Sequence, residues 1–174
     1  MNLQEKCSKI KAVILDVDGV LTDGRIGYRG DSEEDLKFYD VRDGHGIKLA
    51  LRCGLKVGIL SGRQSGANRK RAQELELTFI YESVKNKGEG LQTLLAEHDL
   101  TPEECMYIGD DVVDIPPMKR CGFSVAVANG VEELDLVADY RTRNNGGKGA
   151  VREAIELLLK EQGKWDGIIQ RYLA

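Results

Sequence analysis

Short apolar runs alternate along this chain with longer amphipathic stretches. Runs of four or five apolar residues suit strands that are buried on both faces, and the stretches between them are long enough for helices. Such an alternation is typical of repeated strand-crossover-strand units, which build a parallel sheet. The sequence therefore predicts an α/β fold with a doubly wound, Rossmann-like parallel sheet.

The apolar runs predict five strands and one shorter candidate. They cover residues 12–15, 56–60, 78–81, 106–108 and 123–127, with the shorter one near residues 138–140. Stretches with apolar positions on one face predict helices at residues 46–53, 66–76, 87–98 and 149–162. A capping-box pattern with proline at the first helical position predicts a short helical turn after Thr101.

Residues 25–41 break this alternation. Apolar residues flank a polar turn at residues 29–34, with period-two spacing at Leu36 and Phe38, which predicts a β-hairpin. The hairpin leaves the end of the first strand, so we expect a flap that projects over the carboxyl edge of the sheet. The segment is too short for a separate cap domain.

A chain of 174 residues fits one domain, which buries roughly 70% of its extended-chain surface. We expect a single domain over residues 1–174. The tail of residues 163–174 is too apolar for a purely solvated end. Its apolar residues are Trp165, Ile168, Ile169, Tyr172 and Leu173. They predict that the tail packs on another surface, with a neighbouring subunit as one option.

Composition and charge narrow the classes of partner. Hydrophobic residues make up 41% of the chain and charged residues 31%, which are ordinary values for a globular protein. The net charge of -4 comes without a block of basic residues, so nucleic acid is not an expected partner. Neither a signal-peptide core nor a run of roughly 20 apolar residues is present, so we expect a cytoplasmic protein without a membrane partner.

The four cysteines are widely spaced and form no CxxC pair. They are Cys7, Cys53, Cys105 and Cys121, and only two histidines could join them as metal ligands. Reduced thiols explain them better than a zinc site.

Two carboxylates follow the first predicted strand, in the segment LDVDGV at residues 15–20. Asp16 and Asp18 are one residue apart, so an extended chain turns both side chains the same way. A carboxylate attacks phosphorus only if a cation such as Mg²⁺ offsets its repulsion from an anionic substrate, and a second carboxylate can then transfer protons. The alternative is a simple turn, because aspartate followed by glycine often reverses the chain.

A second acidic cluster, Asp110, Asp111 and Asp114, follows the fourth predicted strand. Hard oxygen ligands suit Mg²⁺. Several carboxylates at one sheet edge without a cation would repel and raise the pKa of one another. A helix N-cap would explain Asp114 alone but not the whole run.

Candidate phosphate ligands follow the second and third strands. Ser61 and Gly62 offer a hydroxyl and backbone N–H groups, and Lys87 would balance the negative charge of phosphate and aspartates. The plain alternatives are a common serine-glycine loop and a solvated lysine. Because the carboxyl ends of the strands meet near the switch point of a doubly wound sheet, one crevice can hold all of these groups.

These segments, in this order, resemble the motifs of the haloacid dehalogenase superfamily: DxDG, then Ser or Thr, then Lys, then GDD with a later Asp. The resemblance spans nearly the whole chain. More narrowly, the chain resembles the 3-deoxy-D-manno-octulosonate 8-phosphate phosphatases through residues 15–23 (LDVDGVLTD), 41–47 (VRDGHGI) and 146–153 (GGKGAVRE). The last segment is the most specific to that branch.

The resemblance implies the roles of the acidic residues. Asp16 would be the nucleophile and Asp18 the acid/base. Asp16, the backbone carbonyl of Asp18, and Asp110 would hold Mg²⁺. Asp111 and Asp114 would support the metal and the lysine without direct ligation.

The resemblance also implies the substrate ligands. Ser61, which replaces the commoner threonine and keeps its hydroxyl, would bind the phosphoryl group with Gly62 and Lys87. Arg63 and Arg71 would engage a sugar-acid carboxylate, since a guanidinium binds carboxylates with two parallel hydrogen bonds. The alternative for both arginines is an ordinary solvated helix face.

The implied activity is removal of phosphate from the eight-carbon sugar acid phosphate in lipopolysaccharide biosynthesis, by a capless homotetramer whose hairpins assemble. A nine-carbon sugar acid 9-phosphate is the alternative substrate. Two other classes stay open: a non-catalytic oligomerisation domain and a phosphoacceptor signalling domain. Asp18 disfavours the latter, because an acid/base so close to the nucleophile shortens the life of a phosphoaspartate.

Overall fold

The computed structural model describes residues 2–28, 30 and 35–173. Its centre is a six-stranded sheet in the order β5-β4-β1-β6-β7-β8, in which every neighbouring pair is parallel. The strands are β1 (Ala12–Leu15), β4 (Lys56–Leu60), β5 (Phe79–Tyr81), β6 (Cys105–Gly109), β7 (Phe123–Ala126) and β8 (Tyr140–Arg141). This arrangement confirms the predicted doubly wound α/β fold.

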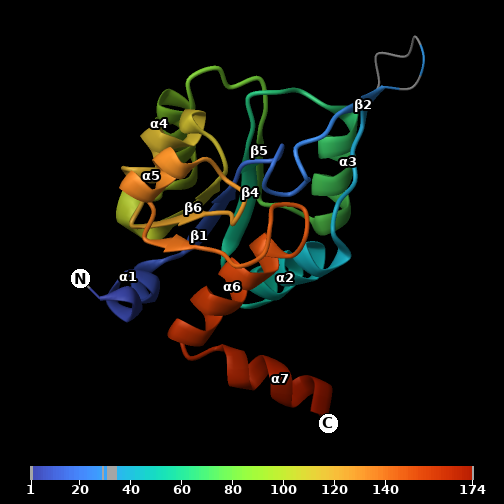
Figure 1. The fold of residues 1–174 in the computed structure, drawn as a ribbon. Coiled ribbons are helices and arrows are strands. Elements are labelled where there is room, and N and C mark those ends of the chain that lie inside the picture. Colours follow the sequence, from blue (N-terminus) through green and yellow to red (C-terminus); the bar gives the residue numbers. More distant parts are fainter. Residues whose placement is uncertain (1, 29, 31–34, 174) are drawn as a thin grey trace.

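The helices lie on both faces of the sheet (Figure 1). The α-helices are α1 (Leu3–Lys9), α2 (Val41–Arg52), α3 (Gly66–Leu75), α4 (Lys87–His98), α5 (Ile115–Met118), α6 (Ala150–Glu161) and α7 (Trp165–Leu173). Short 3-10 turns lie at η1 (Pro102–Glu104), η2 (Val112–Asp114) and η3 (Glu132–Leu136). The capping box predicted at Thr101 is present at the start of η1.

Period-two alternation divides the apolar core between the two faces of the sheet. Val13 and Leu15 of β1 pack in one cluster with α1, α2 and α6, while Ala12 and Ile14 pack in the other with α4 and α5. All four side chains are buried. Both faces of β1 are therefore dry, which is why its sequence is a continuous apolar run rather than an alternating one.

Several helices differ from the sequence expectation. Helix α2 begins at Val41 rather than at residue 46, because the Asp40 side chain accepts a hydrogen bond from the Arg42 N–H and caps the first turn. Helix α1 was not predicted, nor was the tail expected to be helical. In α7, Ile168 is buried against the main core, whereas Tyr172 and Leu173 are exposed.

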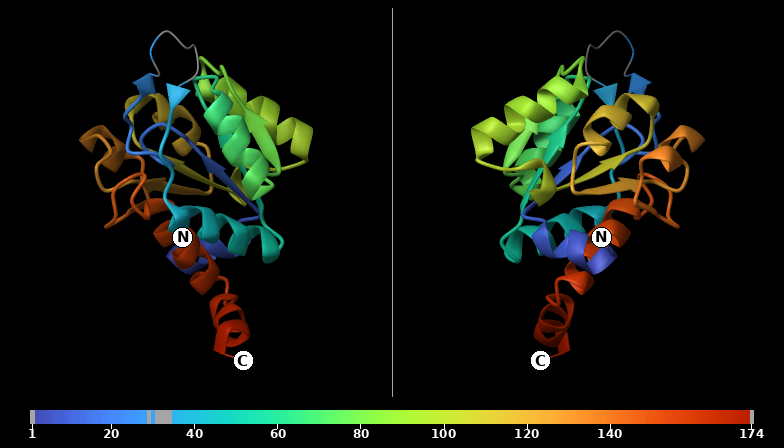
Figure 2. Two further views of the ribbon diagram at one scale, coloured as in Figure 1. Left: turned by 90° about the vertical axis from the view of Figure 1, so that its right-hand side faces the viewer. Right: turned by 90° about the vertical axis from the view of Figure 1, so that its left-hand side faces the viewer.

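The segment after β1 forms the two-stranded antiparallel sheet of β2 (Gly27–Tyr28) and β3 (Asp35–Leu36). Most of the turn predicted at residues 29–34 lies outside the described residues. We call residues 25–28 and 35–41 the flap. Figures 1 and 2 show the flap and helix α7 at opposite ends of the molecule.

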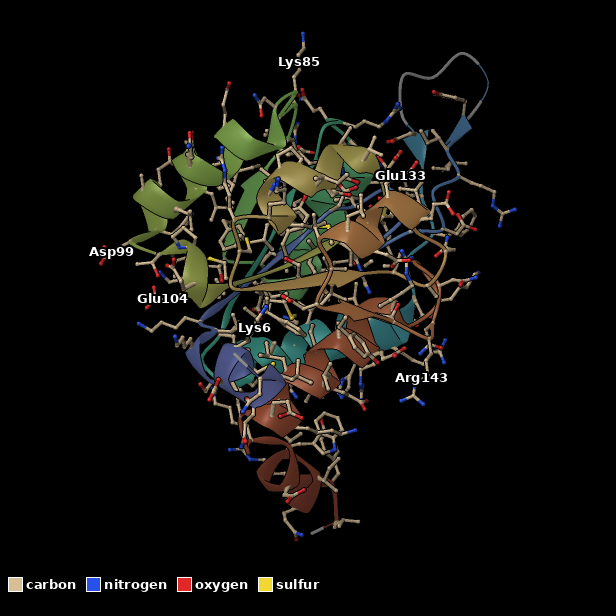
Figure 3. All side chains as sticks on the ribbon, turned by 60° about the vertical axis from the view of Figure 1, so that its left-hand side comes forward. Lys6, Lys85, Asp99, Glu104, Glu133 and Arg143 are labelled. Atoms are coloured by element: carbon tan, nitrogen blue, oxygen red, sulfur yellow. The ribbon has the colours of Figure 1, made fainter. Side chains whose placement is uncertain are left out.

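Charged side chains cover the outside of the molecule; Lys85, Asp99 and Arg143 point away from the body (Figure 3). Among the described residues, no helix is both long enough and apolar enough to cross a membrane.

Candidate active site

A small cavity of about 210 Å³ lies at the carboxyl edge of the sheet. It is lined by Asp16, Asp18, Ser61, Gly62, Arg63, Lys87, Asp110, Asp111 and Val113. These residues follow β1, β4, β5 and β6, and the strand order reverses between β1 and β6. The cavity therefore lies at the switch point where open α/β sheets bind ligands.

Lys87 joins the two acidic clusters. Its Nζ lies 2.8 Å from Oδ1 of Asp16 and 2.5 Å from Oδ1 of Asp114, and all three side chains are buried. Burial works to lower the pKa of Lys87, but the charges of the two aspartates outweigh burial and hold that pKa above its ordinary value. The lysine is thus a buried cation at the first position of α4, unlike the exposed Lys85 two residues earlier.

Asp110 lies against the backbone of Gly19, which ends the DxDG segment. A Cβ on Gly19 would lie 1.9 Å from Oδ2 of Asp110, and Gly19 has a φ of +91°. Any larger residue at position 19 would displace the Asp110 carboxylate or strain the loop. The close approach of Asp110 to the DxDG segment therefore explains why that segment has a glycine at position 19.

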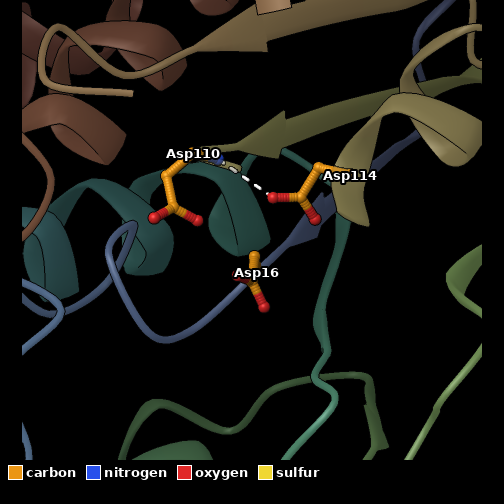
Figure 4. A group of neighbouring side chains, drawn as sticks. All are labelled: Asp16, Asp110 and Asp114. Carbon is orange, nitrogen blue, oxygen red and sulfur yellow. Dashed lines mark hydrogen bonds between the residues drawn. The ribbon is translucent and has the colours of Figure 1, made fainter. Parts of the chain in front are cut away.

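Three carboxylates converge in the cavity. Oxygen atoms of Asp16, Asp110 and Asp114 all lie within 4.8 Å of one another (Figure 4). Burial, followed by the charge of Asp114, raises the pKa of Asp16 to about 6. Burial and the charge of Asp16 raise the pKa of Asp110 to about 8. The single lysine therefore leaves an excess of negative charge that a cation would neutralise.

The oxygen atoms of Asp114 are already occupied. Its Oδ1 accepts hydrogen bonds from Lys87 and from the Tyr107 hydroxyl, and its Oδ2 accepts from the Asp110 and Asp111 N–H groups. Figure 4 shows the bond from the Asp110 N–H. Asp111 instead caps η2, through the Val112 N–H to its Oδ1. Asp114 thus orients the lysine and the Asp110 backbone.

These donors fit a hard divalent cation. Asp16 and Asp110 supply carboxylate oxygens, and the backbone carbonyl of Asp18 belongs to the same loop. An oxygen-only set with few protein ligands suits Mg²⁺, which keeps several waters.

Asp18 faces two cations. Its Oδ1 accepts a hydrogen bond of 2.7 Å from Nζ of Lys37, and its Oδ2 lies 3.8 Å from Nε of Arg63. Lys37 comes from the flap and was missed in the sequence. The sequence does carry a signal for it: in the period-two segment that starts at Asp35, Lys37 falls on the same face of the strand as Asp35.

The phosphate ligands predicted after β4 lie in the cavity. The Ser61 Oγ accepts a hydrogen bond from the Arg63 N–H at 3.2 Å. Arg71, in contrast, does not line the cavity. Its guanidinium stacks 5.7 Å from the centre of the Tyr39 ring and pairs with Glu74.

Tyr107 was also missed by sequence analysis. It is fully buried, and its hydroxyl lies 2.7 Å from Oδ1 of Asp114. A tyrosine in an otherwise apolar strand needs a polar partner, and the aspartates that follow β6 are the nearest candidates.

The glycine-rich segment before α6 packs on the loop that carries the DxDG residues. A Cβ on Gly146 would lie 1.6 Å from the Gly19 carbonyl oxygen, and the Gly147 N–H donates to the Val20 carbonyl at 2.9 Å. The Gly146 N–H also donates a hydrogen bond to Oδ1 of Asn129 at 2.8 Å. This segment therefore buttresses the catalytic loop.

Comparison with known proteins gives a consistent picture. Residues 77–155 match the family model of haloacid dehalogenase-like hydrolases. The chain is 44% identical over 165 residues to a 3-deoxy-D-manno-octulosonate 8-phosphate phosphatase of Escherichia coli, covering 95% of this chain and 87% of that protein. The chain belongs to the 3-deoxy-D-manno-octulosonate 8-phosphate phosphatase family.

Solved structures of this phosphatase family share the fold. A probable YrbI family phosphatase of Pseudomonas syringae superposes with a TM-score of 0.95 at 37% identity, covering 99% of this chain and 97% of that one. The phosphatase of Moraxella catarrhalis superposes with a TM-score of 0.94 at 36% identity, with 97% of each chain covered. That structure holds a magnesium ion, a phosphate ion and a 3-deoxy-D-manno-octulosonate molecule.

Proposed function

We propose that the protein is a Mg²⁺-dependent phosphatase that releases phosphate from 3-deoxy-D-manno-octulosonate 8-phosphate through a phosphoaspartate. One observation carries the proposal: Asp16 lies in one cavity with the buried Lys87 and with Asp110 and Asp18. A nucleophile, a cation, a metal-binding carboxylate and a proton carrier are the groups that this reaction needs.

In the first step, a carboxylate oxygen of Asp16 forms a bond to phosphorus while the bond from phosphorus to the sugar oxygen breaks. Asp18 donates its proton to that departing oxygen. In the second step, Asp18 takes a proton from water, which attacks phosphorus and releases phosphate and the free Asp16 carboxylate.

Ser61 and Lys87 bind the phosphoryl oxygens in both steps and stabilise the charge spread over them. Asp16, Asp110 and the carbonyl of Asp18 would hold Mg²⁺, which offsets the repulsion between the nucleophile and the anionic substrate. Asp111 and Asp114 would support the metal ligands and Lys87 without binding the metal directly.

Arg63 supports a sugar acid as the substrate. It lines the cavity on the side of Asp18, where the leaving group departs, and its guanidinium can bind the carboxylate of the sugar. The names of the relatives favour the eight-carbon over the nine-carbon sugar acid.

We also propose a homotetramer in the cytoplasm. Its support is the apolar outer face of the flap, where Tyr28, Phe38 and Val41 are 68%, 84% and 80% exposed. Large apolar side chains gathered on one element mark an interaction site. Sedimentation velocity checks the assembly: replacing both Leu36 and Phe38 with serine should dissociate it, and an unchanged tetramer would refute this face as the contact.

The function is tested by Mg²⁺-dependent phosphate release from the eight-carbon sugar acid 8-phosphate, the nine-carbon 9-phosphate and p-nitrophenyl phosphate. We expect the highest kcat/KM for the first, with no turnover after Asp16→Asn. Higher kcat/KM for the nine-carbon substrate would change the substrate but keep the chemistry. A stable phosphoprotein formed from acetyl phosphate, without release of phosphate, would instead indicate a signalling acceptor, and no reaction at all would indicate an oligomerisation domain.

A further inference from the structure

The inner face of the flap carries a row of polar side chains. From residue 35 to residue 39 the chain alternates: Asp35, Lys37 and Tyr39 contact the body of the protein, while Leu36 and Phe38 are exposed. The Lys37 side chain has 0% exposure, although Phe38 beside it is 84% exposed. The flap therefore presents an apolar face outward and a charged, buried lysine inward.

Lys37 is held between two carboxylates. Its Nζ lies 2.7 Å from Oδ1 of Asp18 and 3.7 Å from Oδ2 of Asp35. Asp35 is itself fixed, because its Oδ1 accepts a hydrogen bond of 2.6 Å from Oγ of Ser65, the N-cap of α3. The ammonium group thus has a defined place that is anchored to the body of the protein.

This contact constrains the Asp18 carboxylate. A charge-assisted hydrogen bond to Oδ1 is among the stronger polar interactions in a protein, and burial strengthens it further. With Oδ1 occupied, Oδ2 is left on the side of Arg63, which lines the cavity. The carboxylate that must exchange protons with the leaving group and with water is thereby held in one orientation.

We propose that Lys37 is a positioning residue for Asp18, and that the flap takes part in catalysis through this lysine. The proposal rests on the phosphatase function proposed above. Removing the lysine should leave Asp16, Lys87 and the metal-binding carboxylates in place but free the Asp18 carboxylate to rotate. Misplacement of a proton-transfer group lowers kcat more than it changes substrate binding.

The test compares Lys37→Met with Lys37→Arg and with Lys70→Met, a matched loss of an exposed lysine on α3. With p-nitrophenyl phosphate, Lys37→Met should lower kcat by about 10- to 100-fold and lower KM in parallel, so that kcat/KM changes by less than about threefold. Stopped-flow traces of Lys37→Met should show a burst of nitrophenolate, because its departure needs no proton donor, whereas hydrolysis of the phosphoaspartate needs Asp18 to take a proton from water. Lys37→Arg should recover most of the lost kcat, and Lys70→Met should match the wild type.

A double-mutant cycle with Asp18→Asn separates positioning from a purely structural role. If Lys37 acts through Asp18, Lys37→Met has no further effect on phosphate release in the Asp18→Asn background. Additive losses, an unchanged kcat, or a raised KM at constant kcat would each overturn the proposal. Should Lys37→Met fail to fold by circular dichroism, the cycle is run with Lys37→Gln, which removes the charge and keeps a polar side chain.

The two proposals fail in different ways. A wild-type protein that hydrolyses no phosphate ester refutes the phosphatase function. A wild-type protein that is active, with Lys37→Met equally active, refutes only the role of Lys37.

Discussion

The Nζ of Lys87 lies 2.5 Å from Oδ1 of Asp114, and neither side chain is more than 4% exposed. This buried pair connects the start of α4 with η2 and places the ammonium 2.8 Å from Asp16. The lysine therefore serves the fold and the chemistry at once, and removal of its charge should affect both.

Lys87→Met should lower the free energy of unfolding by about 3–5 kcal/mol, because it leaves the buried Asp114 carboxylate without its cation. Turnover should be lost as well, since the phosphoryl group loses a positive ligand. Urea unfolding at neutral pH measures the first effect and phosphate release the second. In the double variant Lys87→Met/Asp114→Asn, part of the stability should return but not the activity; a single variant as stable as the wild type would contradict the pairing.

The metal-free protein should become less stable as the pH rises from about 4 to about 8. The pKa of Asp16 is raised from 3.8 to about 6, and that of Asp110 from 3.8 to about 8. Across this window the unfolded chain has already lost protons that the folded chain keeps, so raising the pH favours unfolding. One pKa unit corresponds to about 1.4 kcal/mol, so the change in the free energy of unfolding should be on the order of kcal/mol. Lys87 and Asp114 are the charged groups that face Asp16 and Asp110: Lys87 contacts Asp16 at 2.8 Å, and an oxygen of Asp114 lies within 4.8 Å of one oxygen from each.

Thermal unfolding with EDTA and with Mg²⁺, at both ends of this pH window, measures that dependence. Mg²⁺ should raise Tm more at the alkaline end, where the carboxylates are ionised. Asp110→Asn should flatten the pH dependence and abolish the response to Mg²⁺. Some slope should persist in that variant, because burial also raises the pKa of Asp43 to about 6. An equal Mg²⁺ effect at both ends would contradict the assignment.

Asp43→Ala should lower the free energy of unfolding by about 1–3 kcal/mol, because it leaves buried N–H groups without an acceptor. The Asp43 carboxylate of α2 accepts hydrogen bonds from the Gly149 and Arg152 N–H groups at the start of α6, at 3.2 and 2.7 Å. Urea unfolding measures the loss. Asp166→Ala, at an exposed position of α7, is the matched control and should change stability by less than about 0.5 kcal/mol.

Gly146→Ala should disturb the catalytic loop, because its Cβ would lie 1.6 Å from the Gly19 carbonyl oxygen. We expect a loss of about 1–3 kcal/mol in the free energy of unfolding, together with a lower kcat. The same substitution at Gly167, where nothing lies within 4 Å of the added methyl group, should be neutral or slightly stabilising. Thermal unfolding and phosphate release check both variants, and equal behaviour would show that the buttress is unimportant.

Much of the fold could be predicted because local periodicity reports burial. Strands β1 and β4 occupy the predicted residues, since all of β1 and all of β4 after Lys56 are buried and carry no charged side chain. Helix α4 also has its predicted bounds. The start of α2 was misplaced because its first turn depends on the Asp40 cap and on close packing at Gly44 and Gly46 rather than on an apolar stripe.

The candidate site was partly visible for the same reason. Asp16, Asp18 and Asp110 follow apolar runs, and parallel strands deliver their ends to one edge. Lys37 and Tyr107 were missed because a local pattern can mark a polar residue that needs a partner, but only the folded chain shows which partner it contacts. In the same way, Arg71 could be named from the sequence, but only the structure places it beside Tyr39 and outside the cavity.

The sequence by itself determined the main strands, their parallel direction and the carboxylates at their ends, because burial and the strand-helix alternation leave local and repeated traces along the chain. The tertiary structure decided how these segments meet: the flap lysine on Asp18, and the Asp43 carboxylate on the start of α6. Residues 41–47 and 146–153 had looked like separate motifs, yet the hydrogen bonds of Asp43 join them. Such contacts depend on distances across the folded chain, which spacing along the sequence does not record.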